Sequence, residues 1–260
     1  MLVDSHCHLN MLDLDPFDGK MDGVIQQARS LGVEHFLLVS CDPSEHNTLA
    51  NIASEFDCVS MSVGLHPTER EKAPLDIAEL LEQAKHNKVV AVGETGLDYF
   101  HCKGNMDWQH QRFEQHIEVA EQTGLPIIVH TRDAKEDTLS FLKQAQRAGV
   151  NGVLHCFTED WAMAKTAIDN GFLISFSGIV TFKNAHIIQE AAVKVPDDAF
   201  LVETDAPFLA PTPYRGKPNV PGYVYYVAKF LAELRACSEA HIAQVTTDNF
   251  KRLFSKAKIS

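Results

Sequence analysis

Two histidines separated by one residue stand almost at the start of the chain, in the segment LVDSHCHL at positions 2–9. Side chains at i and i+2 of a β-strand project from the same face, so His6 and His8 would lie side by side while Cys7 points away. Two adjacent imidazoles could bind a divalent cation, and they could equally be buried structural histidines. The pair alone does not distinguish these two interpretations.

Further side chains that can bind a metal occur where other apolar runs end. A strand buried on both faces of a parallel sheet is expected to be apolar throughout. Here Glu94 ends the run KVVAVGE, His130 ends PIIVH and His155 ends GVLH. Asp205 ends FLVETD, and His66 stands just beyond one more run. These positions add imidazole and carboxylate donors to the first pair.

The runs belong to a pattern in which short apolar segments alternate with longer segments of helical periodicity. The expected strands are residues 2–8, 33–40, 58–64, 88–94, 126–130, 152–155, 172–177 and 200–205. The expected helices are residues 21–31, 44–56, 75–86, 108–123, 135–148, 161–170 and 184–193, followed by 224–235 and 239–253. This alternation predicts an α/β fold with a parallel sheet, and eight strands are the number that closes a TIM barrel.

We therefore predict a single (β/α)8 TIM-like barrel domain over residues 1–260, with an extra C-terminal helix. An open doubly wound sheet is the alternative. That fold would need a glycine-rich phosphate loop after the first strand, and neither GxGxxG nor GxxxxGK[ST] is present.

A closed barrel would bring the polar strand ends together, because the C-terminal ends of its strands converge on one mouth. The donors expected there are His6, His8, Glu94, His130, His155 and Asp205. So many titratable groups in an apolar funnel are costly unless cations balance them. The set therefore predicts a metal centre.

Six donors exceed the three protein ligands of a single catalytic zinc, so they suit two divalent cations. The two oxygens of Glu94 could bridge ions about 3.5–4 Å apart. We expect His6, His8 and Asp205 on one ion and His130 and His155 on the other. Imidazole and carboxylate donors suit zinc or manganese, and magnesium with more bound water.

The chain resembles the TatD family of metal-dependent hydrolases, within the amidohydrolase superfamily, nearly from end to end. The resemblance rests on DSHCHL at 4–9, GLHP at 64–67, GETGLDY at 93–99, IVHTRDA at 128–134, HCF at 155–157, SFSGIVTFKNA at 175–185, ETDAPFLAP at 203–211 and RGKPN at 215–219. The resemblance implies a TIM-like barrel, a divalent-metal site and the same six ligands. It also implies deoxyribonuclease activity, as a 3′–5′ exonuclease on single-stranded DNA ends. The family often continues HCF with Ser-Gly, whereas this chain has Thr158 and Glu159, which puts the substrate preference in doubt.

The expected reaction is hydrolysis of a phosphodiester by a water that the cations activate. Asp205 is the candidate to orient or deprotonate that water, with Glu94 as the second catalytic carboxylate. Glu203 is expected to hold a ligand in place, and Asp98 to brace the loop that follows Glu94. The candidate substrate contacts are His66, Arg132, Arg215, Lys217 and Tyr99, while Phe100 is expected to pack.

The composition limits the classes of partner. A formal net charge of −12 argues against a broad basic face for duplex DNA but not against a local site on DNA ends where cations supply positive charge. No apolar stretch approaches the roughly 20 residues of a membrane span, and Asp4 interrupts the first apolar run, unlike a secretory signal. The six scattered cysteines indicate reduced thiols. We expect a cytoplasmic protein with no membrane contact and no obligate protein partner.

Two alternatives remain open for the function. The same metal pair could hydrolyse a small amide, lactone or phosphoester, because superfamily sites serve many chemistries on one barrel. In the second alternative the protein is not an enzyme and its metal site is structural. Structural sites are normally closed, four-coordinate and rich in cysteine, which the donors here are not.

Overall fold

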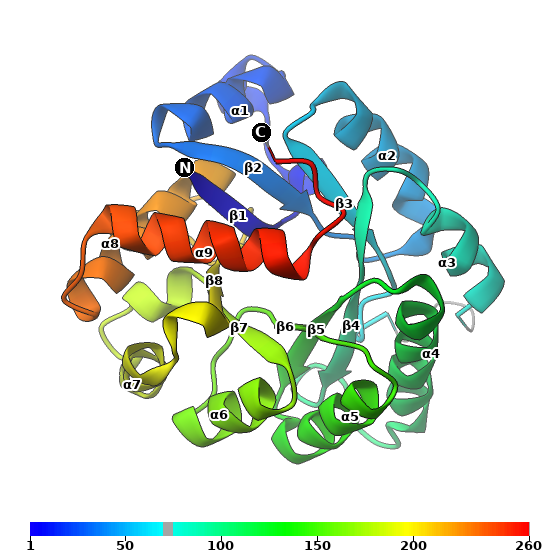
Figure 1. Ribbon diagram of the computed structural model, residues 1–260. Helices are drawn as coiled ribbons and strands as arrows, with labels where there is room; N and C mark the ends of the chain where they lie inside the picture. Colours follow the sequence, from blue (N-terminus) through cyan, green and yellow to red (C-terminus); the bar gives the residue numbers. More distant parts are fainter. Residues whose placement is uncertain (70–74, 260) are drawn as a thin grey trace.

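The computed structural model describes residues 1–69 and 75–259, and within them eight parallel strands are hydrogen-bonded in chain order. The strands are β1 Leu2–Cys7, β2 Val33–Leu38, β3 Val59–Val63, β4 Val89–Asp98, β5 Ile127–Arg132, β6 Gly152–Leu154, β7 Phe172–Phe176 and β8 Phe200–Val202. Helices surround them in Figure 1. The helices are α1 Met21–Ser30, α2 His46–Glu55, α3 Ile77–Gln83, α4 Asp107–Thr123, α5 Lys135–Arg147, α6 Trp161–Asp169, α7 His186–Lys194, α8 Val224–Leu234 and α9 Glu239–Leu253.

The sheet closes on itself, because the segment after β8 returns to β1. Cys7 and Ala206 form a parallel bridge. The amide of Asp205 donates to the carbonyl of His6 at 2.9 Å, and the amide of His8 donates to the carbonyl of Ala206 at 2.8 Å. The predicted TIM-like barrel is therefore confirmed, and an open doubly wound sheet is excluded.

Most strand ends lie within two residues of the prediction, but two differ by three or more, and both lie at the polar end of the barrel. The strand expected to end at Glu94 continues to Asp98 as β4. Its pairing with β5 shifts register between Val92 and Thr95, so β4 accommodates an extra residue beside Glu94. The strand expected at 200–205 ends at Val202, and Asp205 has a φ of +57° that no regular strand allows.

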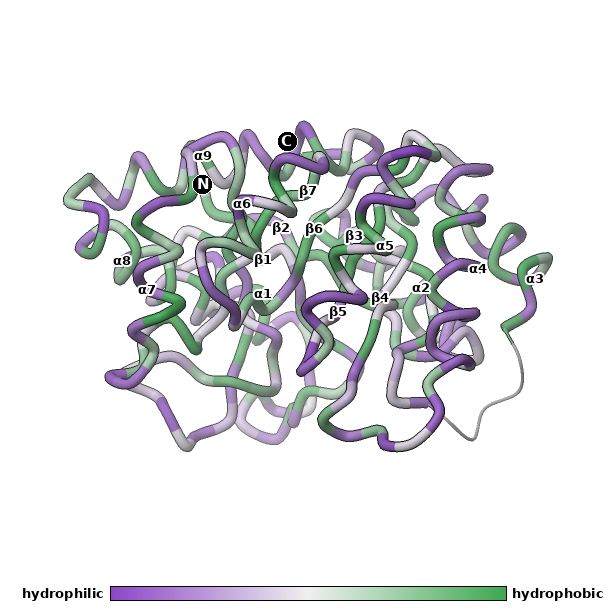
Figure 2. The backbone as a smooth tube through the Cα atoms, turned by 90° about the horizontal axis from the view of Figure 1, so that it is seen from below, coloured by the Kyte–Doolittle hydropathy of each residue, from purple (hydrophilic) through white to green (hydrophobic). Residues whose placement is uncertain are grey.

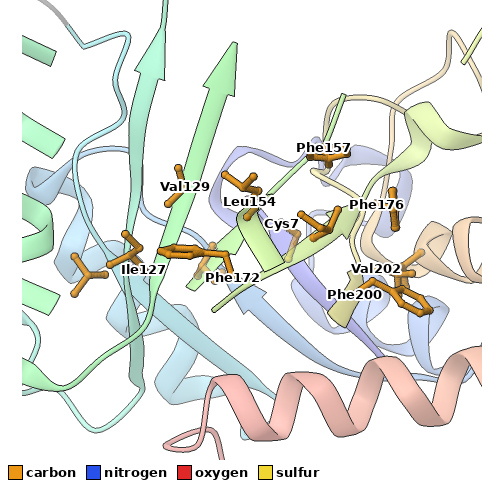
Figure 3. Packing of buried hydrophobic residues seen from close by; sticks show 14 of the residues in the cluster. Cys7, Ile127, Val129, Leu154, Phe157, Phe172, Phe176, Phe200 and Val202 are labelled. Carbon is orange, nitrogen blue, oxygen red and sulfur yellow. The ribbon is translucent and has the colours of Figure 1, made fainter. Parts of the chain in front are cut away.

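The apolar residues form one layer outside the sheet and another inside it. Figure 3 shows part of the outer layer, in which strand residues such as Val129, Phe172 and Phe200 pack towards the helices. Cys7 belongs to this layer and is fully buried, so it points away from the polar end as predicted. The inner layer includes Leu37 and other side chains inside the barrel.

Helix α9 covers the end of the barrel where the strands begin. Its Phe250 joins the inner apolar layer, and Asn249 donates to the carbonyl of Phe200 at the start of β8 at 2.8 Å. Figures 1 and 2 show α9 and both chain termini at this end, with long loops at the other. This extra C-terminal helix leaves the carboxyl ends of the strands free to form a site.

Across residues 1–69 and 75–259, the helices are all too short or too polar to pass through a lipid bilayer.

Candidate metal centre

The six expected metal donors come from five strands and meet at the carboxyl end of the barrel. His6 lies in β1, Glu94 in β4 and His130 in β5. His8 and His155 come directly after β1 and β6, and Asp205 lies three residues beyond β8. The strands are parallel and closed, so their carboxyl ends share one mouth and the side chains converge.

Glu94 is the centre of this cluster and is almost completely buried. Its Oε1 lies 2.7 Å from His155 Nε2, 3.2 Å from His130 Nδ1 and 3.3 Å from His66 Nε2. Its Oε2 lies 3.3 Å from His6 Nε2. The two oxygens of one carboxylate therefore face two different groups of imidazoles.

Asp205 completes the group on the His6 side. Its Oδ1 lies 3.3 Å from His8 Nε2 and 3.7 Å from His6 Nε2. The ligand atoms of these three residues all lie within 4.8 Å of one another, and so do those of His66, Glu94 and His130. The first group is the expected one. The second contains His66 where His155 was expected, and His155 groups instead with His6 and Glu203, although its Nε2 also faces Glu94.

Buried carboxylates hold two of the imidazoles in orientation. Glu203 Oε1 accepts from the amide of Cys156 at 2.7 Å and lies 3.2 Å from His155 Nδ1. Asp98 Oδ2 lies 3.0 Å from His130 Nε2. Each contact occupies one ring nitrogen and turns the other towards Glu94, which is how a carboxylate partner prepares a histidine to bind a metal.

The segment that carries Asp205 is held to β1 by Asp4, a residue that sequence reasoning did not select. The buried Asp4 accepts from the amide of Thr204 at 2.8 Å and from its hydroxyl at 2.5 Å. Thr204 Oγ1 in turn accepts from the amide of Ala206 at 3.1 Å. These bonds fix the backbone on both sides of Asp205, so its carboxylate stays beside His6 and His8.

Gly96 allows β4 to approach β5 closely beside His130. A Cβ at this position would lie 2.0 Å from the carbonyl oxygen of His130, and its φ of +131° belongs to glycine. A side chain here would therefore push His130 away from Glu94.

The donor set fits a divalent cation. Both ring nitrogens of His6 are buried and have no hydrogen-bond partner among the described residues, even though Nε2 lies close to Glu94. A buried polar atom without a partner costs about 1–3 kcal/mol, which a bound cation would offset. Nearby, His8 Nδ1 faces the carbonyl of Val39 at 3.1 Å, leaving Nε2 for a cation. Imidazole and carboxylate atoms are the ligands that zinc and manganese accept.

The electrostatics of the cluster separate its carboxylates from its imidazoles. Burial raises the pKa of Glu94, but His155, His66 and His6 outweigh it and hold that pKa well below its ordinary value. Burial lowers the pKa of His155, but Glu94 and Glu203 outweigh it and raise that pKa well above its ordinary value. The carboxylate is therefore charged and ready to bind a cation, whereas the imidazole carries a proton until a cation replaces it.

Cation binding is expected to strengthen as the pH rises through neutrality. Burial lowers the pKa of His8 and that of His130, but Asp205 and Cys41 outweigh it at His8, and Asp98 and Glu94 outweigh it at His130, so both pKa values are raised. Each of these protons must leave before the imidazole can bind a cation. Titration calorimetry with Mn²⁺ in buffers of different ionisation enthalpy should detect proton release and a higher affinity at higher pH. An affinity that stays constant between about pH 6 and 8 would contradict this prediction.

A pocket of about 350 Å³ opens over the cluster. Its lining includes His66 and Arg132 from the expected substrate contacts, and Asp98, Thr158 and Phe208 beside them. The position at which the sequence differs from the family pattern, Thr158, therefore lies in the wall of the pocket.

Three expected substrate contacts are not brought to this pocket. The hydroxyl of Tyr99 lies 2.6 Å from both His110 Nε2 and Asp137 Oδ2 and borders a different cavity. The guanidinium of Arg215 lies 4.2 Å from the ring centre of Phe182, and Lys217 lies over Tyr214. The charged groups of Arg215 and Lys217 both lie near aromatic rings. The loop after β8 therefore does not direct these two side chains into the pocket.

Two further candidate metal ligands, Cys41 and His66, were not among the six expected ones. Cys41 lies with His8 and Glu94 in a group whose ligand atoms are within 4.8 Å of one another, and it lines the pocket. His66 was expected to contact substrate, yet its Nε2 faces Glu94. Cys41 directly follows the expected strand 33–40, as the other donors follow theirs, so its position was a usable signal.

Comparison with known proteins gives a consistent result. A family model described as "TatD related DNase" matches residues 3–255. The chain is 45% identical over 253 residues to the uncharacterized metal-dependent hydrolase YcfH of Escherichia coli strain K12, covering 97% of this chain and 95% of YcfH. It is 40% identical over 255 residues to the uncharacterized metal-dependent hydrolase YabD of Bacillus subtilis, covering 98% and 99%. Among solved structures, the TatD homologue YJJV of Escherichia coli superposes with a TM-score of 0.89 at 27% identity, covering 98% of each chain.

Proposed function

The chain belongs to the family of TatD-related DNases and is a metal-dependent hydrolase, and we propose that it hydrolyses phosphodiesters at single-stranded DNA ends, as a 3′–5′ exonuclease. We further propose that two divalent cations, zinc, manganese or magnesium, bind to His6, His8, Glu94, His130, His155 and Asp205. The cytoplasm is the proposed location, which the six free thiols support.

The observation that carries this proposal is the position of Glu94 between two groups of imidazoles at the floor of an open pocket. A pair of cations held there would supply the positive charge that a phosphoryl group needs and would make water more acidic. The pocket is small and local. It can therefore accept a strand end although the whole chain carries a net charge of −12.

The side chains of the protein then have distinct tasks. Asp205 is fixed by His8 and by the Asp4–Thr204 contacts, so its carboxylate can orient the attacking water and accept its proton. The exposed guanidinium of Arg132 at the pocket wall can donate two parallel hydrogen bonds to two oxygens of a phosphate. Glu203 and Asp98 keep His155 and His130 in orientation.

Removal of the cations is expected to stop release of nucleotides from a 3′-labelled single strand. The protein should be dialysed exhaustively against EDTA, assayed, and then reloaded separately with Mg²⁺, Mn²⁺ or Zn²⁺ while its thermal unfolding is followed. We expect activity to disappear and return with at least one cation, with the fold retained throughout. Full activity in excess chelator would contradict the proposal.

The same preparation should be tested on small amides, lactones and phosphoesters. Turnover of one of these without release of nucleotides would replace the nuclease proposal with the alternative hydrolase. Unfolding on chelation, with no turnover of any substrate, would indicate a structural metal site.

A further inference from the structure

Exposed aromatic rings are concentrated around the pocket. The chain has fifteen phenylalanines, all in the described part, and only Phe100 and Phe208 are exposed, by 50% and 52%. Phe208 lines the pocket, and Phe100 stacks against Arg132, which also lines it. Large apolar side chains left in water beside a site mark a surface that contacts a ligand.

Phe208 is held rigidly although its ring is exposed. Its amide donates to the carbonyl of Asp205 at 2.9 Å, and its carbonyl accepts from the side chain of Asn219. Asn219 is buried and also donates to the carbonyl of Thr204 at 2.9 Å. The ring lies 6.2 Å from that of His8, edge to face. The backbone therefore presents a phenyl ring directly beside the metal donors.

Phe100 is positioned in a similar way in the loop that follows another strand, β4. Its amide donates to Asp98 Oδ1 at 3.0 Å, and the other oxygen of Asp98 contacts His130. The guanidinium carbon of Arg132 lies 5.0 Å from the centre of the Phe100 ring. This contact leaves an aromatic surface next to a cation that can bind phosphate.

Phe100 and Phe208 follow strands that lie on opposite sides of the barrel. Phe100 follows β4 and Phe208 follows β8, and in a closed barrel with its strands in chain order these two strands are four apart. Four steps is half the circumference of eight strands. The strand ends that carry Glu94 and the other donors converge on the same mouth.

We propose that Phe208 and Phe100 each stack on an unpaired base, on either side of the phosphate bound over the metal donors. This inference rests on the proposed nuclease function and names the residues that select its substrate. A base can stack on a side chain only after leaving its neighbours, which costs a few kcal/mol in a duplex and much less in a single strand. The rings therefore favour unpaired ends, whatever their sequence, since every base has a stacking face.

The test compares Phe208→Ala, Phe100→Ala and the conservative Phe208→Tyr with a matched control, Ile187→Ala, an exposed apolar residue in α7 outside the pocket lining. Each Mn²⁺-loaded variant is assayed on a single strand with normal 3′ residues and on the same strand with two abasic 3′ residues. We expect each alanine at a ring to raise KM about tenfold on the normal strand, with little change in kcat. Phe208→Tyr keeps an aromatic face, so its KM should stay well below that of Phe208→Ala, and Ile187→Ala should behave as the unmodified chain.

The abasic strand separates stacking from a structural effect. Without bases there is nothing to stack, so Phe208→Ala and the unmodified chain should have equal KM values on it. An unchanged KM of both alanine variants on the normal strand would overturn the proposal. An equal loss on both strands would also overturn it, because the rings would then act on the fold or on the donors.

A binding measurement keeps this inference separate from the nuclease proposal. A phosphorothioate strand resists cleavage, so its affinity can be measured by the fluorescence anisotropy of a dye at its 5′ end, with and without two abasic 3′ residues. A weaker affinity of Phe208→Ala than of the unmodified chain for the normal strand, with equal affinities for the abasic strand, supports the inference even if no DNA is hydrolysed, a result that would refute only the nuclease function. Equal affinities of the two proteins for the normal strand would overturn the inference, whether or not DNA is hydrolysed.

Discussion

Replacing Glu94 by glutamine is expected to slow hydrolysis of single-stranded DNA by about a thousandfold or more and to lower the bound metal content. Glu94 is the group whose two oxygens face both sets of imidazoles. Glutamine keeps the size but loses the charge and turns an N–H donor towards one set. The negatively charged ligand that the two cations would share is then lost. The measurements are kcat and metal content per chain by elemental analysis.

The control for Glu94→Gln is Glu118→Gln, which makes the same chemical change at an exposed position of α4. That control should leave both readouts unchanged, and both variants should melt cooperatively. Glu94→Gln with ordinary metal content and ordinary turnover would show that Glu94 does not join the two groups, and the proposed centre would fail.

The second large effect is expected from Asp205→Asn, with kcat reduced by about 100- to 10,000-fold. Burial raises the pKa of Asp205, but the hydrogen bond from His8 and the charge of His6 outweigh it and keep that pKa below its ordinary value. The carboxylate is therefore ionised at neutral pH and can accept a hydrogen bond or a proton from water. Asparagine cannot accept that proton.

The effect of Asp205→Asn should appear in kcat more than in metal content. The donors His130, His155 and Glu94 are untouched, and His6 and His8 remain in place. Asp169→Asn, in an exposed ion pair of α6, provides the matched control. If Asp205→Asn lowers metal content in proportion to activity and leaves turnover per bound cation unchanged, Asp205 is a ligand only and has no part in activating water.

The fold could be predicted from local patterns, because the periodicity of apolar residues reports the type of each element. The helix expected at 239–253 coincides with α9, and the one at 21–31 differs from α1 by one residue. Strand ends were less accurate. The apolar run ends at Gly93 and Glu94, so the predicted strand ended there. The backbone hydrogen bonding of β4 continues to Asp98.

The candidate metal donors could be identified because they are ionisable side chains at the ends of otherwise apolar strand segments. Burying an imidazole or a carboxylate in a strand is costly unless another group bonds to it or neutralises its charge. Each of these residues can therefore be recognised within its apolar run. That argument found the six donors at the barrel mouth. It missed Asp4, because the Thr204 groups that donate to its carboxylate are 200 positions away.

The amino-acid sequence alone therefore determined the order of elements, the barrel and which six polar side chains meet at its mouth, since these follow from residue type and short-range periodicity. Only the tertiary structure decided which loop side chains face the pocket. Tyr99 turns to His110 and Asp137, whereas the neighbouring Phe100 stays exposed beside Arg132. The orientation of each side chain depends on the partners that the fold places near it. Those partners come from residues distant in the sequence.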